Sequence, residues 1–319
     1  MMFRALPPLA LLFLLAFAPF TGPGTASAKT APAYLALGDS LAFGVGATNP
    51  AAEGYVALTA SALGDGLFAD SGLELINLSE PDATSADLVA PDGQLEQALA
   101  EIASRQSNDE SGDAVAVISI DIGSSDLSAL SRPDSPCFED AAGGLCRDAL
   151  NAMLGDLQTN LTRVLTELHT AAPTADVYVV DTFHPYAEAG GPQDAIAAIG
   201  VQQVNGVIAA ASADEELAVR FVTVHELFQG SGERWVAPDG IHPNNDGHRV
   251  LSEALLAAIE DRNVALPTDL AQQPSPAPSD DAGGGDDDVS LTWLLVIVPL
   301  AFIAGAFVSA AYFVVRGRR

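Results

Sequence analysis

The sequence is poor in basic residues, and lysine is almost absent. Its 319 residues include 42 Asp and Glu against 13 Lys and Arg, and the only lysine is Lys29. The formal net charge is −29 at pH 7. Such a surface repels polyanions, which argues against nucleic acid or anionic polysaccharide as the main partner. Solubility or a saline habitat explains the charge at least as well as a functional role does.

Cysteine is almost as scarce as lysine. Only Cys137 and Cys146 occur, both within the segment 132–147, and no histidine lies near them in the sequence. Two thiols are too few ligands for a metal site, so no metal is predicted. In an oxidising compartment the two cysteines are expected to form a local disulfide, worth about 2–3 kcal/mol for so short a loop.

The first 28 residues have the pattern of a secretory signal peptide. Arg4 supplies the positive start, Leu9 to Phe17 the apolar segment, and Ala26-Ser27-Ala28 a cleavage site of small residues before Lys29. The sequence therefore predicts export of everything that follows residue 28.

The C-terminal end predicts a membrane anchor. Leu291 to Val315 is free of charged residues and long enough to cross a bilayer, and the basic residues of 316–319 favour a cytoplasmic tail. The preceding segment, 266–290, is rich in Pro, Ser, Asp and Gly and is expected to be a disordered linker. We therefore expect a single-pass protein of the cell membrane whose domain, 29–265, lies outside the cytoplasm.

Within that domain, short apolar runs alternate with helical patterns. The runs predict five strands, near 34–37, 73–77, 114–122, 176–181 and 219–224. The helical patterns cover 53–63, 94–104, 148–170, 195–211 and 245–259. Such alternation is typical of an α/β domain in which helices cover both faces of a parallel sheet.

The first strand ends abruptly in Gly38-Asp39-Ser40 and is followed by a helical pattern. In open α/β sheets, the turns after the strands lie at the edge where ligands bind. A serine in such a turn can act as a nucleophile if a base reaches it. Asp239 and His242, three residues apart in a Pro/Gly-rich loop, are the candidate base and its partner.

The early Gly38-Asp39-Ser40 and the late Asp239-x-x-His242-Pro243 resemble the motifs of the SGNH (GDSL) hydrolases, over about residues 33–259. The resemblance implies a three-layer α/β/α sandwich with a five-stranded, flavodoxin-like parallel sheet. It also implies a triad of Ser40, His242 and Asp239 that needs no cofactor.

The oxyanion hole is where the sequence departs from that family. The resemblance implies three donors: the backbone N–H of the serine, a glycine N–H after the second strand, and an asparagine side chain after the third. Here Asp82 takes the place of the glycine and Ser125 that of the asparagine. If the turn at position 82 requires a positive φ, aspartate tolerates it better than most residues do. Ser125 offers a hydroxyl on a shorter arm.

The sequence therefore predicts a membrane-anchored serine hydrolase that cleaves small-molecule, lipid or carbohydrate esters. Two alternatives stay open. One is a domain of the same fold that binds ligands without turning them over, and the other is a carbohydrate O-deacetylase. The sequence leaves the acyl and alcohol specificity and the oligomeric state undetermined.

Overall fold

Five parallel strands form the centre of the computed structural model, which describes residues 31–106, 114–184, 192–229, 232–266 and 270. The strands lie in the order β2-β1-β3-β4-β5. Their bounds are β1 (Ala33–Gly38), β2 (Glu74–Asn77), β3 (Val115–Asp121), β4 (Asp176–Val180) and β5 (Val219–Val222). The predicted five-stranded parallel sheet is thus confirmed.

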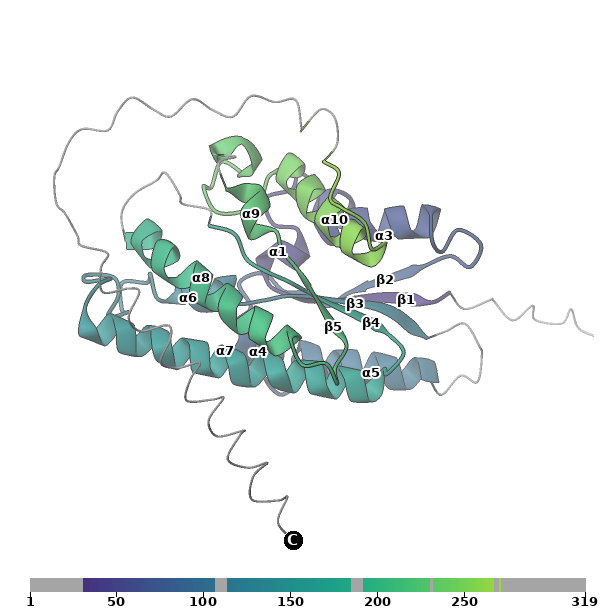
Figure 1. Cartoon of the computed structure of the whole chain (residues 1–319), viewed down its shortest axis with the longest axis horizontal. Coiled ribbons are helices and arrows are strands. Elements are labelled where there is room, and N and C mark those ends of the chain that lie inside the picture. Colours follow the sequence, from purple (N-terminus) through teal and green to yellow (C-terminus); the bar gives the residue numbers. More distant parts are fainter. Residues whose placement is uncertain (1–30, 107–113, 185–191, 230–231, 267–269, 271–319) are drawn as a thin grey trace, which may run out of the picture. The chain divides into compact units, whose positions relative to one another are not determined.

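Helices cover both faces of this sheet, as the sequence predicted (Figure 1). One layer consists of α4 (Ser85–Leu88), α5 (Gln94–Gln106), α6 (Ser124–Ala129), α7 (Gly144–Ala171) and α8 (Pro192–Ser212). The other contains α1 (Ser40–Phe43), α3 (Tyr55–Asp65), α9 (His225–Phe228) and α10 (Asn245–Ile259). The short helix α2 (Pro50–Glu53) packs on α3, and the 3₁₀ turn η1 (Gly232–Trp235) packs on α10.

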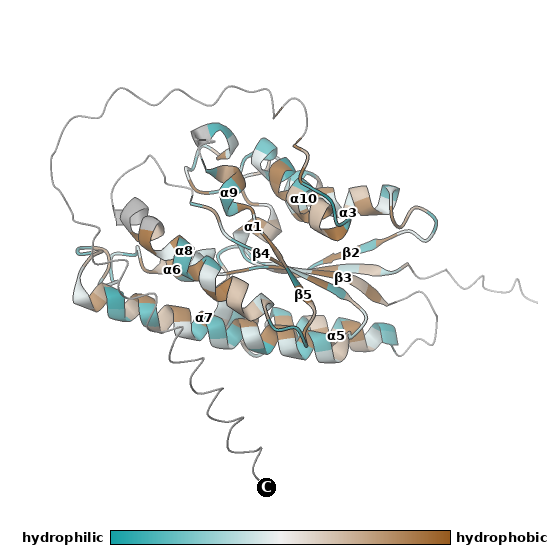
Figure 2. Ribbon diagram, in the orientation of Figure 1, coloured by the Kyte–Doolittle hydropathy of each residue, from teal (hydrophilic) through white to brown (hydrophobic). Residues whose placement is uncertain are grey.

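The alternation of side chains along β1 explains the two layers. Leu35 and Leu37 are buried in the core shared with α5, α7 and α8, whereas Tyr34 and Ala36 are buried in the core shared with α3 and α10. A strand buried on both faces is apolar throughout, which is why β1 reads as a continuous hydrophobic run. In Figure 2 the apolar residues gather along the inner sides of the helices.

Several boundaries differ from the prediction. The helix expected over 53–63 is divided, because Gly54 takes an extended backbone (φ −65°, ψ 148°) between α2 and α3. The helix expected from residue 148 begins earlier, at Gly144. The short helices α1, α4, α6 and α9 were not predicted, because four to six residues are too few to show a helical period.

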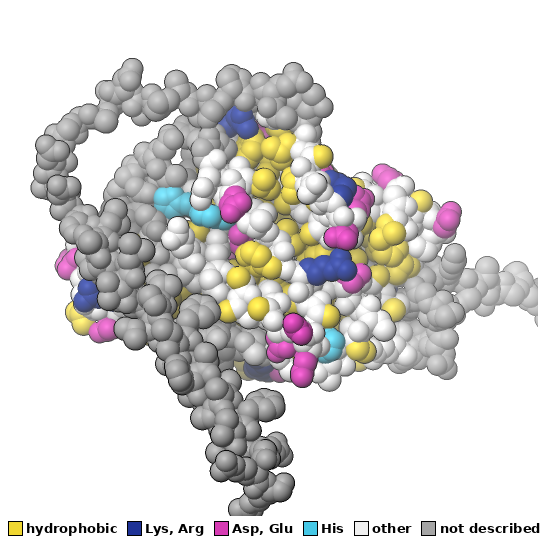
Figure 3. Space-filling model, viewed as in Figure 1, with side chains coloured by type: hydrophobic (Ala, Val, Ile, Leu, Met, Phe, Trp, Pro, Cys, Tyr) yellow, Lys and Arg dark blue, Asp and Glu magenta, His cyan; other side chains and the backbone are white. Residues whose placement is uncertain are grey.

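The predicted disulfide between Cys137 and Cys146 is present, in the connection from α6 to α7. The predicted signal peptide (1–28), membrane helix (291–315) and tail (316–319) fall outside the described residues. Within the described segments, no helix has both the length and the apolarity that a bilayer crossing requires. On the face drawn in Figure 3, acidic side chains are scattered widely and basic ones occur in a few separate places.

The strand order creates one crevice at the carboxyl edge of the sheet. From β1 the chain passes to β2 on one side, and the next strand, β3, pairs with β1 on the other side. Connections that leave neighbouring strands in opposite directions open a space between them, where ligands bind in such folds. The segments after β1 and β3, which begin at Asp39 and Ile122, meet there.

Candidate active site

The turn after β1 is fixed by a close approach of two backbones. Gly38 has a φ of +147°, and a Cβ built on it would lie 2.2 Å from the carbonyl oxygen of Asp121. The side-chain amide of Gln94 accepts a hydrogen bond from the Gly38 N–H and donates one to its carbonyl, both at 2.8 Å. Only glycine fits this position, and it sets the direction in which Asp39 and Ser40 leave the sheet.

Asp39 forms the buried floor beneath Ser40. Its carboxylate accepts hydrogen bonds from the Leu41 N–H at 3.1 Å, the Ser124 hydroxyl at 2.6 Å and the Ser125 N–H at 3.4 Å. Complete burial raises the pKa of Asp39 to about 6, although these hydrogen bonds oppose the shift. The carboxylate thereby ties the turn after β1 to the segment after β3.

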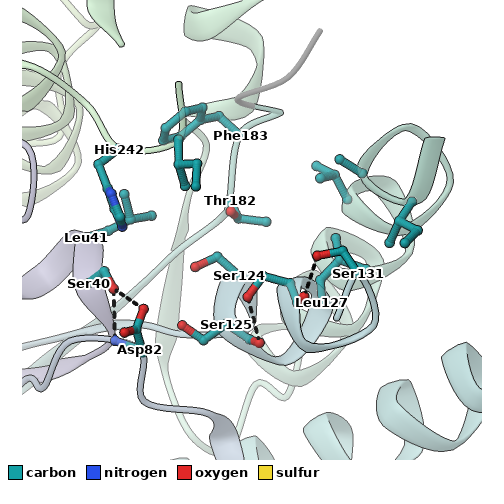
Figure 4. Close-up of a pocket in the computed structure, with 15 residues that line it drawn as sticks. Ser40, Leu41, Asp82, Ser124, Ser125, Leu127, Ser131, Thr182, Phe183 and His242 are labelled. Atoms are coloured by element: carbon teal, nitrogen blue, oxygen red, sulfur yellow. Dashed lines mark hydrogen bonds between the residues drawn. The ribbon is translucent and has the colours of Figure 1, made fainter. Parts of the chain in front are cut away.

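Asp82 contacts the Ser40 hydroxyl through both its backbone and its side chain. The Ser40 Oγ accepts a hydrogen bond from the Asp82 N–H at 2.9 Å and donates one to the Asp82 Oδ1 at 3.4 Å (Figure 4). Asp82 has a φ of +60°, so this turn does require the left-handed backbone considered from the sequence. Its N–H therefore faces the serine oxygen, as an oxyanion donor would.

His242 is held by Asp239 within one tight loop. The ring Nδ1 lies 2.8 Å from Asp239 Oδ2, while the backbone N–H groups of Ile241 and His242 donate to Asp239 Oδ1. Partial burial works to raise the pKa of Asp239, but the hydrogen bonds from the His242 ring and from the two N–H groups outweigh it and hold the pKa below its usual value. Asp239 thus orients the ring through Nδ1, and Nε2 is the ring nitrogen that this carboxylate does not contact.

A second glycine brings this loop to the serine. Gly46, in the segment after α1, has a φ of +93°, and a Cβ there would lie 2.2 Å from the Pro243 carbonyl oxygen and 2.9 Å from the His242 Cβ. The two loops pack together because position 46 has no side chain. Figure 4 shows the His242 ring pointing toward the turn that carries Ser40. No hydrogen bond joins these two described side chains, since the Ser40 hydroxyl is bonded to Asp82.

Ser125 lines the pocket together with Ser40, but its hydroxyl is directed toward Asp39. Its hydroxyl is 3.5 Å from Asp39 Oδ2, and its side chain is almost fully buried. The neighbouring Asp126 carboxylate accepts hydrogen bonds from the Ser85 N–H at 2.8 Å and hydroxyl at 2.6 Å. Ser125 therefore joins α6 to the turn after β1, and Asp126 joins α6 to α4.

A pocket of about 140 Å³ opens beside these groups. The pocket is lined by four of the predicted site residues: Ser40, Asp82, Ser125 and His242. Asp239 does not line it, but its carboxylate contacts the His242 ring. The apolar walls of the pocket were not predicted; they come from α1, α6, α8, the segment after β4 and the His242 loop, and comprise Leu41, Leu127, Phe183, Ile196, Ala197, Val201 and Ile241. Nothing in the sequence near any one of these residues marks it as a pocket wall, because the pocket forms only when these elements pack.

Two other buried polar residues, Asp121 and His248, do not line this pocket. Asp121 is buried at the end of β3, and burial, together with the Asp39 charge, raises its pKa well above the usual range. His248 is buried between the Tyr55 N–H, 3.3 Å from its Nδ1, and the Val45 carbonyl, 3.0 Å from its Nε2. Among the described residues, no group of three or more His, Cys, Asp or Glu could hold a metal ion.

Comparisons with solved structures agree with this fold. Solved structures with a similar fold include the lipase Lip_vut3 from a goat rumen metagenome, with a TM-score of 0.52 and 20% sequence identity over 71% of this chain and 97% of that chain. An extracellular lipase from Streptomyces rimosus gives a TM-score of 0.50 and 22% identity over 73% of this chain and 100% of that chain. No curated protein sequence matches.

The family comparison covers the whole site. Residues 36–250 match the sequence model of the GDSL-like lipase/acylhydrolase family. The matched segment contains the Ser40 turn, the Asp82 and Ser125 positions and the Asp239–His242 loop. The resemblance drawn from two short motifs thus extends over most of the described domain, and the chain belongs to the GDSL-like lipase/acylhydrolase family.

Proposed function

We propose that this domain hydrolyses carboxylic esters through an acyl-serine intermediate, with Ser40 as the nucleophile, His242 as the general base and Asp239 as the group that orients it. One observation carries the proposal: residues about two hundred positions apart in the sequence line the same pocket, and the histidine is already fixed by a carboxylate. This is the arrangement of roles that activates a serine in hydrolases on many folds.

The reaction begins with a small movement. With Nδ1–H donated to Asp239, the ring Nε2 is the atom that takes the Ser40 proton once the hydroxyl turns from Asp82 toward His242. The serine oxygen then bonds to the ester carbonyl carbon, and the alcohol departs with the proton from His242. Water, deprotonated by the same ring, attacks the acyl-serine and releases the acid. Every proton passes through His242, so no cofactor is needed.

The oxyanion of the tetrahedral intermediate would be met by the backbone N–H groups of Ser40 and Asp82. Ser125 is a weaker third donor, because its hydroxyl is shared with Asp39. The loss of one such donor lowers rates by about 10²–10³ in serine hydrolases. We therefore expect a functional but slow enzyme.

The apolar walls of the pocket favour apolar parts of a substrate. The wall from α8 is apolar, α6 contributes Leu127 together with serine hydroxyls, and the described residues that line the pocket include no Lys or Arg. Small-molecule, lipid or carbohydrate esters are the substrates we propose, and a panel of short-chain, long-chain and acetylated-sugar esters would rank them. Preference for acetylated sugars in that panel would identify a carbohydrate O-deacetylase.

A fluorophosphonate probe tests the proposal, because it reacts only with an activated serine. The full-length chain should be labelled, and Ser40→Ala should abolish both labelling and ester turnover. Ser61→Ala, which removes an exposed hydroxyl on α3, is the matched control and should behave like the unaltered protein. Equal turnover by the Ser40→Ala variant and the unaltered chain would overturn the proposal.

A binding domain without turnover is the competing function. The two hydrogen bonds between Ser40 and Asp82, in place of one between Ser40 and His242, favour it. Such a domain would bind esters in the pocket yet stay unlabelled by the probe. The same labelling experiment therefore separates the two functions.

We propose further that the domain is exported and tethered to the cell membrane. The support lies in the sequence alone: the signal-like residues 1–28 and the uncharged segment 291–315 followed by arginines. Cell fractionation with a protease protection assay would test this. The full-length chain should sediment with membranes and be cleaved from outside, and truncation after residue 290 should release it.

A further inference from the structure

Asp82 places a carboxylate beside the nucleophile, at a position where the family uses a residue without a side chain. Its Oδ1 lies 3.4 Å from the Ser40 Oγ, and its side chain is exposed to the pocket. Among the described residues, no Lys or Arg lines the pocket, and none forms an ion pair with this carboxylate.

This carboxylate opposes the reaction of a neutral ester. The oxyanion formed by attack of Ser40 is two bonds from the serine oxygen, so it develops within about 6 Å of Asp82 Oδ1 in the observed arrangement. Two negative charges that close repel, and a repulsion of this kind slows the step by about tenfold at an exposed site. Asp82 thus contributes both a backbone N–H that stabilises the oxyanion and a carboxylate that repels it.

A positive charge on the substrate reverses this effect. An ammonium group a few bonds from the ester carbonyl would lie between Asp82 and the oxyanion and would attract both. Building on the proposed function, we propose that this enzyme prefers esters that carry a cationic group close to the scissile bond, and that Asp82 is the residue that selects them. The apolar pocket would hold the uncharged remainder of the substrate.

Two pairs of esters with matched shapes test the selection. Butyrylcholine and 3,3-dimethylbutyl butyrate differ by a charge on the alcohol side, and glycine ethyl ester and ethyl propionate differ by a charge on the acyl side. In at least one pair, the full-length chain should show about tenfold higher kcat/KM for the cationic member, and the preference should weaken as salt is added. The pair that responds tells which side of the ester faces Asp82.

Asp82→Asn should abolish the preference and raise the rate on the neutral ester. Asparagine keeps the backbone N–H and tolerates the left-handed φ, so the turn is retained. Asp92→Asn is a closely matched control: Asp92 is exposed, has a φ of +59° and lies outside the pocket, so it tests the effect of one lost charge on a strongly acidic protein. That variant should keep the preference.

The outcomes separate this inference from the function on which it depends. Equal kcat/KM within both pairs, or a preference that survives Asp82→Asn, would overturn the inference while leaving the ester hydrolase intact. Failure to turn over any of the esters, together with an unlabelled Ser40, would overturn the proposed function itself. If Ser40 is labelled but turnover is slow, protection of Ser40 against the probe is measured instead. Equal protection by butyrylcholine and its neutral analogue would again overturn the inference.

Discussion

The two sides of the Ser40 site are built differently. On one side, the Asp39 carboxylate lies fully buried and joins α1 to α6. On the other, the side chains of His242 and Asp239 are 18% and 43% exposed and belong to one loop. The buried floor is held by hydrogen bonds between segments distant in sequence, whereas the exposed pair is held mostly by its own turn. Changes to the floor should therefore cost stability, and changes to the loop should cost activity alone.

His242→Ala gives the largest expected effect and tests the loop side. Loss of the base should lower kcat by about 10⁴-fold or more, because the serine proton then has no acceptor. Ester turnover and thermal unfolding are measured together. The unfolding temperature should change little, since the ring makes its one hydrogen bond to an exposed partner. A large drop in the unfolding temperature would show that the His242 ring contributes to the stability of the fold, contrary to this prediction.

Asp39→Asn tests the floor through the pH dependence of stability. The pKa of Asp39 is about 6 in the folded protein and 3.8 in a model peptide, so between those values the unfolded chain loses its proton first. The free energy of unfolding contributed by this group falls as pH rises from about 4 to about 6, by at most about 3 kcal/mol. The Asp39→Asn variant lacks this pH-dependent loss of stability. Denaturant unfolding at pH 4 and pH 7 should therefore show that the free energy of unfolding of the variant, relative to that of the unaltered protein, is higher at pH 7. If the free energy of unfolding changes equally with pH in the two proteins, the prediction is wrong.

Asp126→Ala removes another buried carboxylate, which joins α6 to α4. The Ser85 N–H and hydroxyl would lose their acceptor in a buried site, which should cost about 2–3 kcal/mol in the free energy of unfolding. Asp87→Ala is the control, because Asp87 is an exposed member of the capping box of α4 and its loss should cost only about 1 kcal/mol. If the two variants lost the same free energy of unfolding, the buried carboxylate would contribute no more to stability than the exposed one.

Much of the fold could be predicted because its signals are local. The apolar run before Gly38 is a strand buried on both faces, and the turn after it follows from glycine and aspartate chemistry. The Asp239-x-x-His242 spacing likewise predicts a contact that forms within one loop. Short helices such as α6, by contrast, have no period to detect and are stabilised by packing.

The sequence named four residues that line one pocket, but it did not indicate which contacts they make there. Ser40, Asp82, Ser125 and His242 all line one pocket, yet Ser125 bonds to Asp39 and Ser40 bonds to Asp82. Which partner a side chain bonds to depends on the groups that surround it in the folded structure. The spacing of residues along the chain does not predict that partner.

The sequence by itself determined the α/β class, the order of the strands along the chain, the disulfide pair and the residue types available for chemistry, because these depend on periodicity and short-range geometry. Only the tertiary structure decided where Ser40 directs its hydroxyl, which apolar side chains wall the pocket and how close the Asp82 carboxylate comes to the nucleophile. Those outcomes depend on contacts between segments as far apart as the turn after β1 and the loop before α10. They are set by packing, which no single stretch of the chain encodes.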